Sequence, residues 1–132
     1  MNGRLLIVLA IAIMGAGITA RAHHSFAATY HEDKTVTIQG KLVQFLFRNP
    51  HSFVHVEAPD ENGEMVRWAV EWAGVGQLTG AGITRETLKF GDVVVITANP
   101  GRNPADHRLR MVTLKRPSVG FTWGQAPGQV VD

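Results

Sequence analysis

Hydrophobic and polar residues alternate in five runs along this chain, and clusters of glycine, proline, asparagine and aspartate separate the runs. A period of two, in segments rich in β-branched and aromatic residues, is typical of half-buried β-strands. Gly40 interrupts the first and longest run, and a glycine inside a strand often marks a bulge or a sharp bend. The strands that this pattern predicts are 35–47, 52–58, 65–72, 92–98 and 108–115.

One short helix is the other regular element that we expect. It lies within residues 75–88, between the third and fourth strands, and is interrupted at residues 80–82 by two glycines. A long, bent first strand allows a small sheet to close on itself. This order of elements therefore predicts an all-β fold, a small five-stranded OB-fold-like Greek-key barrel. A small immunoglobulin-type sandwich is the alternative, but about seven strands are expected there.

The first 22 residues differ in composition from the rest of the chain. A basic residue precedes an uncharged apolar run, and the small residues Ala20 and Ala22 follow it, as in a signal peptide. The run is shorter than the about 20 apolar residues that cross a bilayer. We expect cleavage between Ala22 and His23, export to the periplasm or the medium, and no stable membrane span afterwards. An uncleaved anchor and a cut after Ala20 are the alternatives.

The chain is expected to have three parts: a signal peptide at 1–22, a barrel domain at 23–116 and a C-terminal tail at 117–132. Arg4 and Arg21 account for the formal net charge of +2, so the processed chain is formally neutral. A neutral exported domain lacks the basic surface of a nucleic-acid-binding protein, and we expect no nucleic acid partner. Cysteine is absent, which excludes disulfides and thiolate metal ligands.

A hairpin is predicted between the second and third strands, because a three-residue loop ending at Gly63 joins them. The matching register places Phe53 opposite Glu71, and it separates the side chains cleanly into an apolar and a polar face. The core face is expected to consist of Val54, Val56, Val66, Trp68, Val70 and Trp72.

Two histidines and a carboxylate then share the outer face of the hairpin. Glu71 lies diagonal to both His51 and His55, at about 7–8 Å, within reach of long side chains. The two histidines are about 13 Å apart along the strand, so the simplest functional pair is Glu71 with one of them. An ordinary polar contact on an exposed sheet face is the alternative interpretation.

The expected new N-terminus has metal-binding chemistry of its own. A terminal His23 would chelate a metal through its α-amine and its imidazole Nδ1, and His24, His51 or His55 could supply a further imidazole. Nitrogen ligands in this arrangement suit Cu(II). After a cut at Ala20, His23 would instead stand third in the chain, which also suits Cu(II) or Ni(II). The candidate metal ligands are therefore His23, His24, His51, His55 and Glu71.

Several short motifs together resemble an uncharacterised family of small exported bacterial proteins, known as a domain of unknown function. The resemblance spans about residues 22–115 and implies a small periplasmic β-barrel, but no activity. The motifs that carry it are His23-His24-Ser25-Phe26, Gly40, Arg48-Asn49-Pro50-His51, Trp68-Ala69-Val70-Glu71 and Leu88-Lys89-Phe90-Gly91-Asp92-Val93.

Two classes of function remain open. The first is a periplasmic binding or carrier protein, with Cu(II) as the favoured ligand. The second is a structural or interaction module that binds a periplasmic partner through Phe47, Arg48 and Phe53, without a metal. We do not expect an enzyme, because the sequence contains no serine-protease order, nucleotide-binding loop or zinc-binding helix motif.

Overall fold

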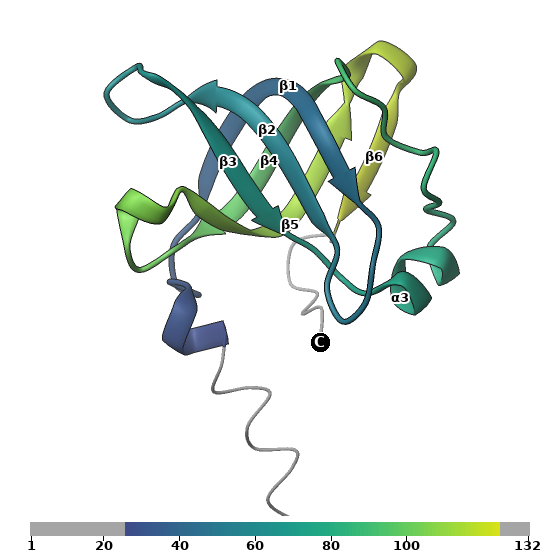
Figure 1. Ribbon diagram of the computed structural model, residues 1–132, viewed down its shortest axis with the longest axis horizontal. Helices are drawn as coiled ribbons and strands as arrows, with labels where there is room; N and C mark the ends of the chain where they lie inside the picture. The colour runs from purple at the N-terminus through teal and green to yellow at the C-terminus, as the bar shows by residue number, and fades with distance from the viewer. Residues whose placement is uncertain (1–25, 125–132) are drawn as a thin grey trace, which may run out of the picture.

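Five strands close into a barrel in the computed structural model, which describes residues 26–124 (Figure 1). The strands are β1 (Val36–Leu46), β2 (Phe53–Pro59), β3 (Met65–Glu71), β4 (Val93–Pro100) and β5 (Arg108–Arg116). β1 pairs with both β2 and β4, β2 pairs with β3, and β4 pairs with β5, all antiparallel. A short parallel pairing of β3 with β5 closes the barrel. The predicted OB-fold-like barrel is confirmed.

Gly40 explains how β1 can serve two neighbours. A Cβ atom at this position would lie 2.0 Å from the carbonyl oxygen of Glu57 on β2, so the close approach of the two backbones requires glycine. A register shift between Leu42 and Gln44 then adds a local irregularity to the β1–β2 pairing. The first half of β1 pairs with β4 and the second half with β2.

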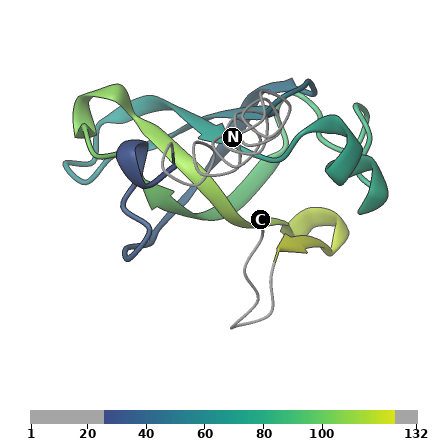
Figure 2. The same cartoon turned by 90° about the horizontal axis from the view of Figure 1, so that it is seen from below.

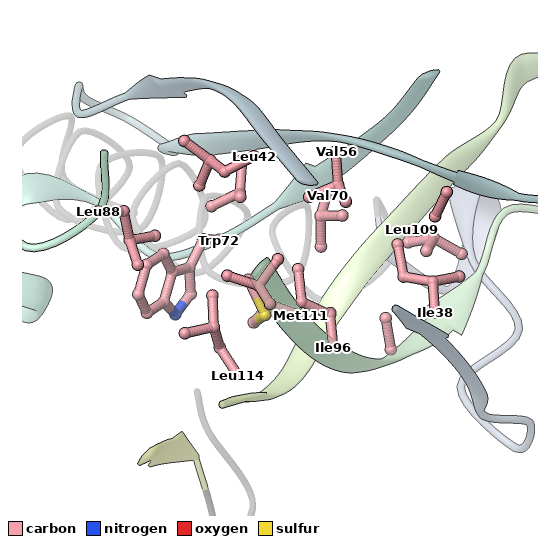
Figure 3. Close-up of a cluster of buried hydrophobic side chains, with 14 of the residues drawn as sticks. Ile38, Leu42, Val56, Val70, Trp72, Leu88, Ile96, Leu109, Met111 and Leu114 are labelled. Atoms are coloured by element: carbon pink, nitrogen blue, oxygen red, sulfur yellow. The ribbon is translucent and has the colours of Figure 1, made fainter. Parts of the chain in front are cut away.

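The predicted hairpin register is also confirmed. Phe53 pairs with Glu71 and Val54 with Val70, as the face pattern requires. Four residues of the predicted core face, Val54, Val56, Val70 and Trp72, join one buried hydrophobic cluster with Ile38, Leu42, Ile96, Leu109, Met111 and Leu114 (Figure 3). Trp68 packs against this cluster, whereas Val66, near the start of β3, is half-buried and does not belong to it.

Short helical elements connect the strands. The helix α3 (Val75–Gly80) lies between β3 and β4, as predicted, and ends at the glycines. The 3-10 helices are η1 (Pro104–Asp106) and η2 (Pro117–Val119). Within residues 26–124, no helix has the length and apolar character needed to cross a membrane.

A sixth strand lies inside the segment expected as a C-terminal tail. β6 (Phe121–Gly124) pairs antiparallel with the end of β5 and extends the sheet. Phe121 and Trp123 pack against the hydrophobic core, and the Trp123 ring lies edge-on to Trp72 at 4.9 Å between centroids. Trp123 therefore packs next to the residue that follows the last residue of β3.

A helical turn at residues 26–29 begins the described chain and packs beside the β4–β5 loop, which Figures 1 and 2 show from two directions. The backbone N–H of Arg102 donates to the Thr29 carbonyl at 2.9 Å, and the Arg102 side chain donates to the Ala27 carbonyl at 2.6 Å. Tyr30 follows in an isolated bridge with Gly101. The segment is thus held against the outside of the barrel.

Candidate functional site

Glu71, the last residue of β3, is a buried carboxylate at the centre of a polar cluster. Glu71 is only 8% exposed, although it belongs to the outer face of the hairpin. The Tyr30 hydroxyl donates to Oε2, and an Arg108 guanidinium nitrogen lies 3.2 Å from the same oxygen. The Nδ1 atom of His51 lies 2.6 Å from Oε1. One carboxylate therefore joins three segments that are far apart in the sequence.

Tyr30 reaches Glu71 because the helical turn before it is fixed to the β4–β5 loop. Its side chain is completely buried. Burial raises the pKa of the Tyr30 hydroxyl above its usual range, and the hydrogen bond and negative charge of Glu71 raise it further. The hydroxyl therefore remains a donor to the carboxylate.

His51 is positioned by the loop that enters β2. The preceding Asn49–Pro50 peptide is cis, and the Asn49 side chain accepts from the backbone N–H of Val75 at 2.9 Å. A Cβ atom at Gly74 would lie 2.6 Å from the Pro50 carbonyl oxygen, so this loop and the start of α3 approach closely. A carboxylate accepts hydrogen bonds and does not donate them, so Nδ1 of His51 carries the proton. Nε2 is left for another partner.

A cavity of about 180 Å³ lies beside this cluster. His51 and Glu71 contribute polar atoms, and the Phe26 ring lies 5.4 Å from the His51 ring. Its other walls include Trp72, Arg110, Met111 and Trp123. The cavity is thus largely apolar, with one oriented imidazole in its wall.

The structure separates the two histidines that the sequence left equivalent. His55 accepts a hydrogen bond at Nδ1 from Arg67 Nε at 3.2 Å, and it makes no contact with Glu71. Burial lowers the pKa of His55, and the positive charges of Arg67 and Arg48 lower it further. Of these two histidines, only His51 pairs with Glu71.

The three predicted contact residues do not form one patch. Phe53 lies between two guanidinium groups, with Arg48 at 5.3 Å and Arg108 at 5.8 Å from its ring centroid. Phe47 instead packs against Phe45, with Arg85 above its ring. Arg48 and Phe53 are therefore neighbours, and Phe47 belongs to a different aromatic group.

His23 and His24 lie outside the described residues. Among residues 26–124, no group of three or more histidine, aspartate or glutamate side chains could hold a metal ion. The described part of the barrel offers the oriented imidazole of His51, so a metal site built from histidines and carboxylates would need ligands from elsewhere.

Tyr30 and Arg108 are site residues that the sequence pattern did not identify. They precede and follow Glu71 by 41 and 37 positions. Tyr30 is the single tyrosine of the chain, which is the only sequence signal that sets it apart. Arg108 opens a predicted strand, but nothing in its neighbourhood indicates a carboxylate partner.

Comparison with known families identifies the chain. Residues 11–110 match the family of unknown function DUF6152, and because this match covers most of the chain, the protein belongs to that family. The resemblance to a domain of unknown function is thereby confirmed. Searches of curated proteins and of solved structures found no match.

Proposed function

We propose that this member of the DUF6152 family is an exported binding protein that holds one copper ion between its processed N-terminus and His51. The observation that carries the proposal is the contact of Phe26 with His51, whose Nδ1 atom is held by the buried Glu71. Phe26 follows the expected terminal His23 by three residues, so the oriented histidine contacts a residue close in sequence to the expected metal-binding terminus. Binding and transfer of the ion, rather than catalysis, is the proposed role.

The His51–Glu71 pair supports the proposal by its geometry. Histidines that bind metals commonly donate their other ring N–H to a carboxylate, which fixes the tautomer and raises the basicity of the ligand nitrogen. His51 has this arrangement, with Nδ1 on Glu71 at 2.6 Å and Nε2 free to bind. The side chain of His51 is 37% exposed, so an ion can reach it from outside the barrel.

The length of the chain before Phe26 supports the second half of the site. An extended chain spans about 3.3–3.6 Å per residue, so a terminal His23 is within about 10 Å of Phe26. Phe26 itself contacts the His51 ring. The α-amine and imidazole of His23, with the Nε2 atom of His51, would supply three nitrogen ligands, a set that suits Cu(II).

Export is part of the proposal. The apolar run before Ala22 and the small residues at the cut site support cleavage between Ala22 and His23. Only that cut makes the His23 amine available, so localisation and metal binding are linked. The periplasm or the medium is the compartment in which we expect the processed protein.

The test uses protein that is exported and processed by its own signal. Native mass spectrometry first reads the N-terminal residue, and isothermal titration with electron paramagnetic resonance then measures Cu(II) binding. We expect one tightly bound ion with nitrogen ligands. An alanine inserted between Ala22 and His23, or His51→Ala, should weaken binding at least about tenfold.

His55→Ala is the matched control, because His55 lies on the same sheet face but contacts Arg67. It should leave Cu(II) affinity unchanged. Glu71→Gln should weaken binding about 10–100-fold by releasing His51, whereas Glu57→Gln on the exposed strand should not. Equal affinity of the wild type and the chain with the inserted alanine would contradict the proposal.

A second candidate function is an interaction module without metal. It is supported by the position of the Phe53 ring between the guanidinium groups of Arg48 and Arg108. Such a surface suits an acidic or aromatic segment of a partner protein. Under this function Phe53→Ala would abolish capture of the partner, and removal of metal would have no effect.

A further inference from the structure

We infer that the cavity beside His51 binds monovalent copper, with the Met111 thioether and the His51 imidazole as ligands and an indole ring beside the ion. The inference rests on the proposed function in taking copper as the metal. The inference adds the Met111 thioether, a ligand that the terminal site lacks, and this soft ligand gives the cavity a preference for Cu(I).

The closing pair of strands brings Met111 to this cavity. Glu71 of β3 is level with Arg110 of β5 in the parallel pairing, which ends there. The next residues, Trp72 and Met111, point to the opposite side, into the barrel, because side chains alternate along a strand. Both line the cavity, at 4% and 7% exposure, and Figure 3 shows both among the buried side chains.

His51 approaches the same cavity from the outer face. It comes from the loop before β2 and is held by Glu71, while Met111 comes from the core side. The two ligand types can share one space only because β3 and β5 stop pairing at this point. Both residues line the cavity of about 180 Å³, a volume that is large enough for a single ion.

The chemistry of the walls favours Cu(I). A thioether is a soft ligand that selects Cu(I), and an imidazole binds copper in either oxidation state. A cation over the face of a tryptophan ring is stabilised by the negative charge of the π-system. Trp72 and Trp123, in contact at 4.9 Å, provide two such rings at this cavity.

The charge of the surroundings points in the same direction. The cost of moving an ion out of water rises with the square of its charge, so a largely apolar cavity accepts a monovalent ion more readily than a divalent one. Glu71 contributes a carboxylate at the wall, and Arg108, 3.2 Å from its Oε2 atom, offsets part of that charge. Arg110 is a second cation, but its guanidinium lies 4.0 Å from the Phe26 ring centroid and 3.1 Å from Glu32, which offsets its charge.

The methionine content makes this inference simple to test. Met1 and Met14 belong to the expected signal peptide, so the processed chain carries Met65 and Met111 alone. Met65 is 67% exposed at the start of β3 and does not line the cavity. It is a matched control for Met111.

The first experiment follows the two methionine methyl groups by NMR in the processed protein while Ag(I), a redox-inert substitute for Cu(I), is added. We expect the Met111 methyl signal to shift with one equivalent of Ag(I) and the Met65 signal to stay in place. His51→Ala should remove the shift. A shift of Met65 alone, or of neither signal, would overturn the inference.

The second experiment measures Cu(I) affinity in competition with a chromogenic Cu(I) chelator under argon. Met111→Leu keeps the side-chain volume, so the fold is expected to persist. Its Cu(I) affinity should fall at least tenfold, while its Cu(II) affinity stays at the wild-type value; Met65→Leu should change neither.

The two proposals fail in different ways. If the inserted alanine before His23 leaves Cu(II) affinity unchanged but the Met111 signal still responds to Ag(I), only the terminal site is wrong. If the inserted alanine weakens Cu(II) binding and Met111→Leu binds Cu(I) as tightly as the wild type, the terminal site stands and the cavity site is overturned.

Discussion

His51 and His55 stand two residues to either side of Phe53 in the sequence, but His55 lies within β2, on the outer face of the β2–β3 hairpin, and His51 in the loop before it, and their surroundings differ. His51 is bonded to the buried Glu71 and covered by Phe26. His55 accepts from Arg67, a residue on the open part of the same face. The alternation of side chains in the sequence does not distinguish the two, so the difference comes from the end of the β2–β3 pairing at Phe53 and from the segments that cover His51.

The two acidic residues of this face show the same contrast. Glu57 is exposed in the middle of β2, whereas Glu71 is 8% exposed at the end of β3. β5 lies beside Glu71, and Tyr30 reaches it from the turn that precedes β1. An outward-facing residue thus becomes buried where the barrel closes. The contrast predicts large effects of mutation at the closed end and small ones on the open face.

The largest effect is expected for Glu71→Ala. The change leaves the buried Tyr30 hydroxyl without an acceptor and removes the contacts with His51 and with Arg108, which is itself 41% exposed, so we expect a loss of about 3 kcal/mol. Urea unfolding followed by tryptophan fluorescence measures the free energy of unfolding. Glu57→Ala, the control on the open face, should stay within about 0.5 kcal/mol of the wild type. Equal losses of stability for both variants would show that the burial of Glu71 does not set it apart from Glu57.

A smaller loss is expected for Tyr30→Phe, which keeps the ring and removes the hydroxyl. A hydrogen bond to a charged group contributes about 1.5–3 kcal/mol, and this one holds the N-terminal turn to the barrel. The same unfolding experiment measures it. The exposed hydroxyl pair of Thr37 and Thr97 gives a comparison, since Thr37→Val should cost much less. If Tyr30→Phe leaves the free energy of unfolding unchanged, the hydroxyl does not contribute to the cluster.

The contribution of the Tyr30 hydroxyl should also appear in the unmutated protein, as a loss of stability at alkaline pH. The folded state holds the Tyr30 proton because burial raises its pKa, while the unfolded chain loses it near pH 10. The folded state then binds more protons, so stability falls above about pH 10, by up to about 1.4 kcal/mol per pH unit. Tyrosinate absorbance reports this one tyrosine directly. The tyrosinate signal should appear only together with unfolding. Ionisation of Tyr30 near pH 10 in the folded protein would contradict the burial of its hydroxyl.

The smallest effect separates the two histidines. His51→Ala removes the hydrogen bond to Glu71 and the contact with Phe26, and should cost about 1 kcal/mol at neutral pH. His55→Ala removes one exposed contact with Arg67, and should stay within about 0.5 kcal/mol. Chemical unfolding of the two variants side by side measures the difference. A greater loss for His55→Ala would reverse the comparison.

Much of the barrel could be predicted from the sequence, because it depends on local patterns. The hairpin register followed from the requirement that the valines of β2 and β3 share one face, and Gly63 marked its turn. Gly40 indicated the bend that lets β1 pair with two strands. The copper ligands expected at His23 and His24 lie outside the described residues and stay a prediction.

The composition of the site could be predicted only in part. The register brought Glu71 near two histidines, but it did not favour His51 over His55. Tyr30 and Arg108 carry no pattern that connects them to Glu71. Trp123 belongs to a four-residue strand within a segment rich in glycine and proline, which was expected to be a tail, although it forms a wall of the cavity.

The sequence by itself determined the five barrel strands, their faces and the β2–β3 register, because each of these depends on the alternation of side chains over a few neighbouring residues. Only the tertiary structure decided which histidine Glu71 holds, and that Tyr30 and Arg108 complete the cluster. These contacts form when β3 meets β5 and the turn at residues 26–29 docks on the β4–β5 loop. Such pairings between distant segments buried the carboxylate and oriented His51, and no local pattern encodes them.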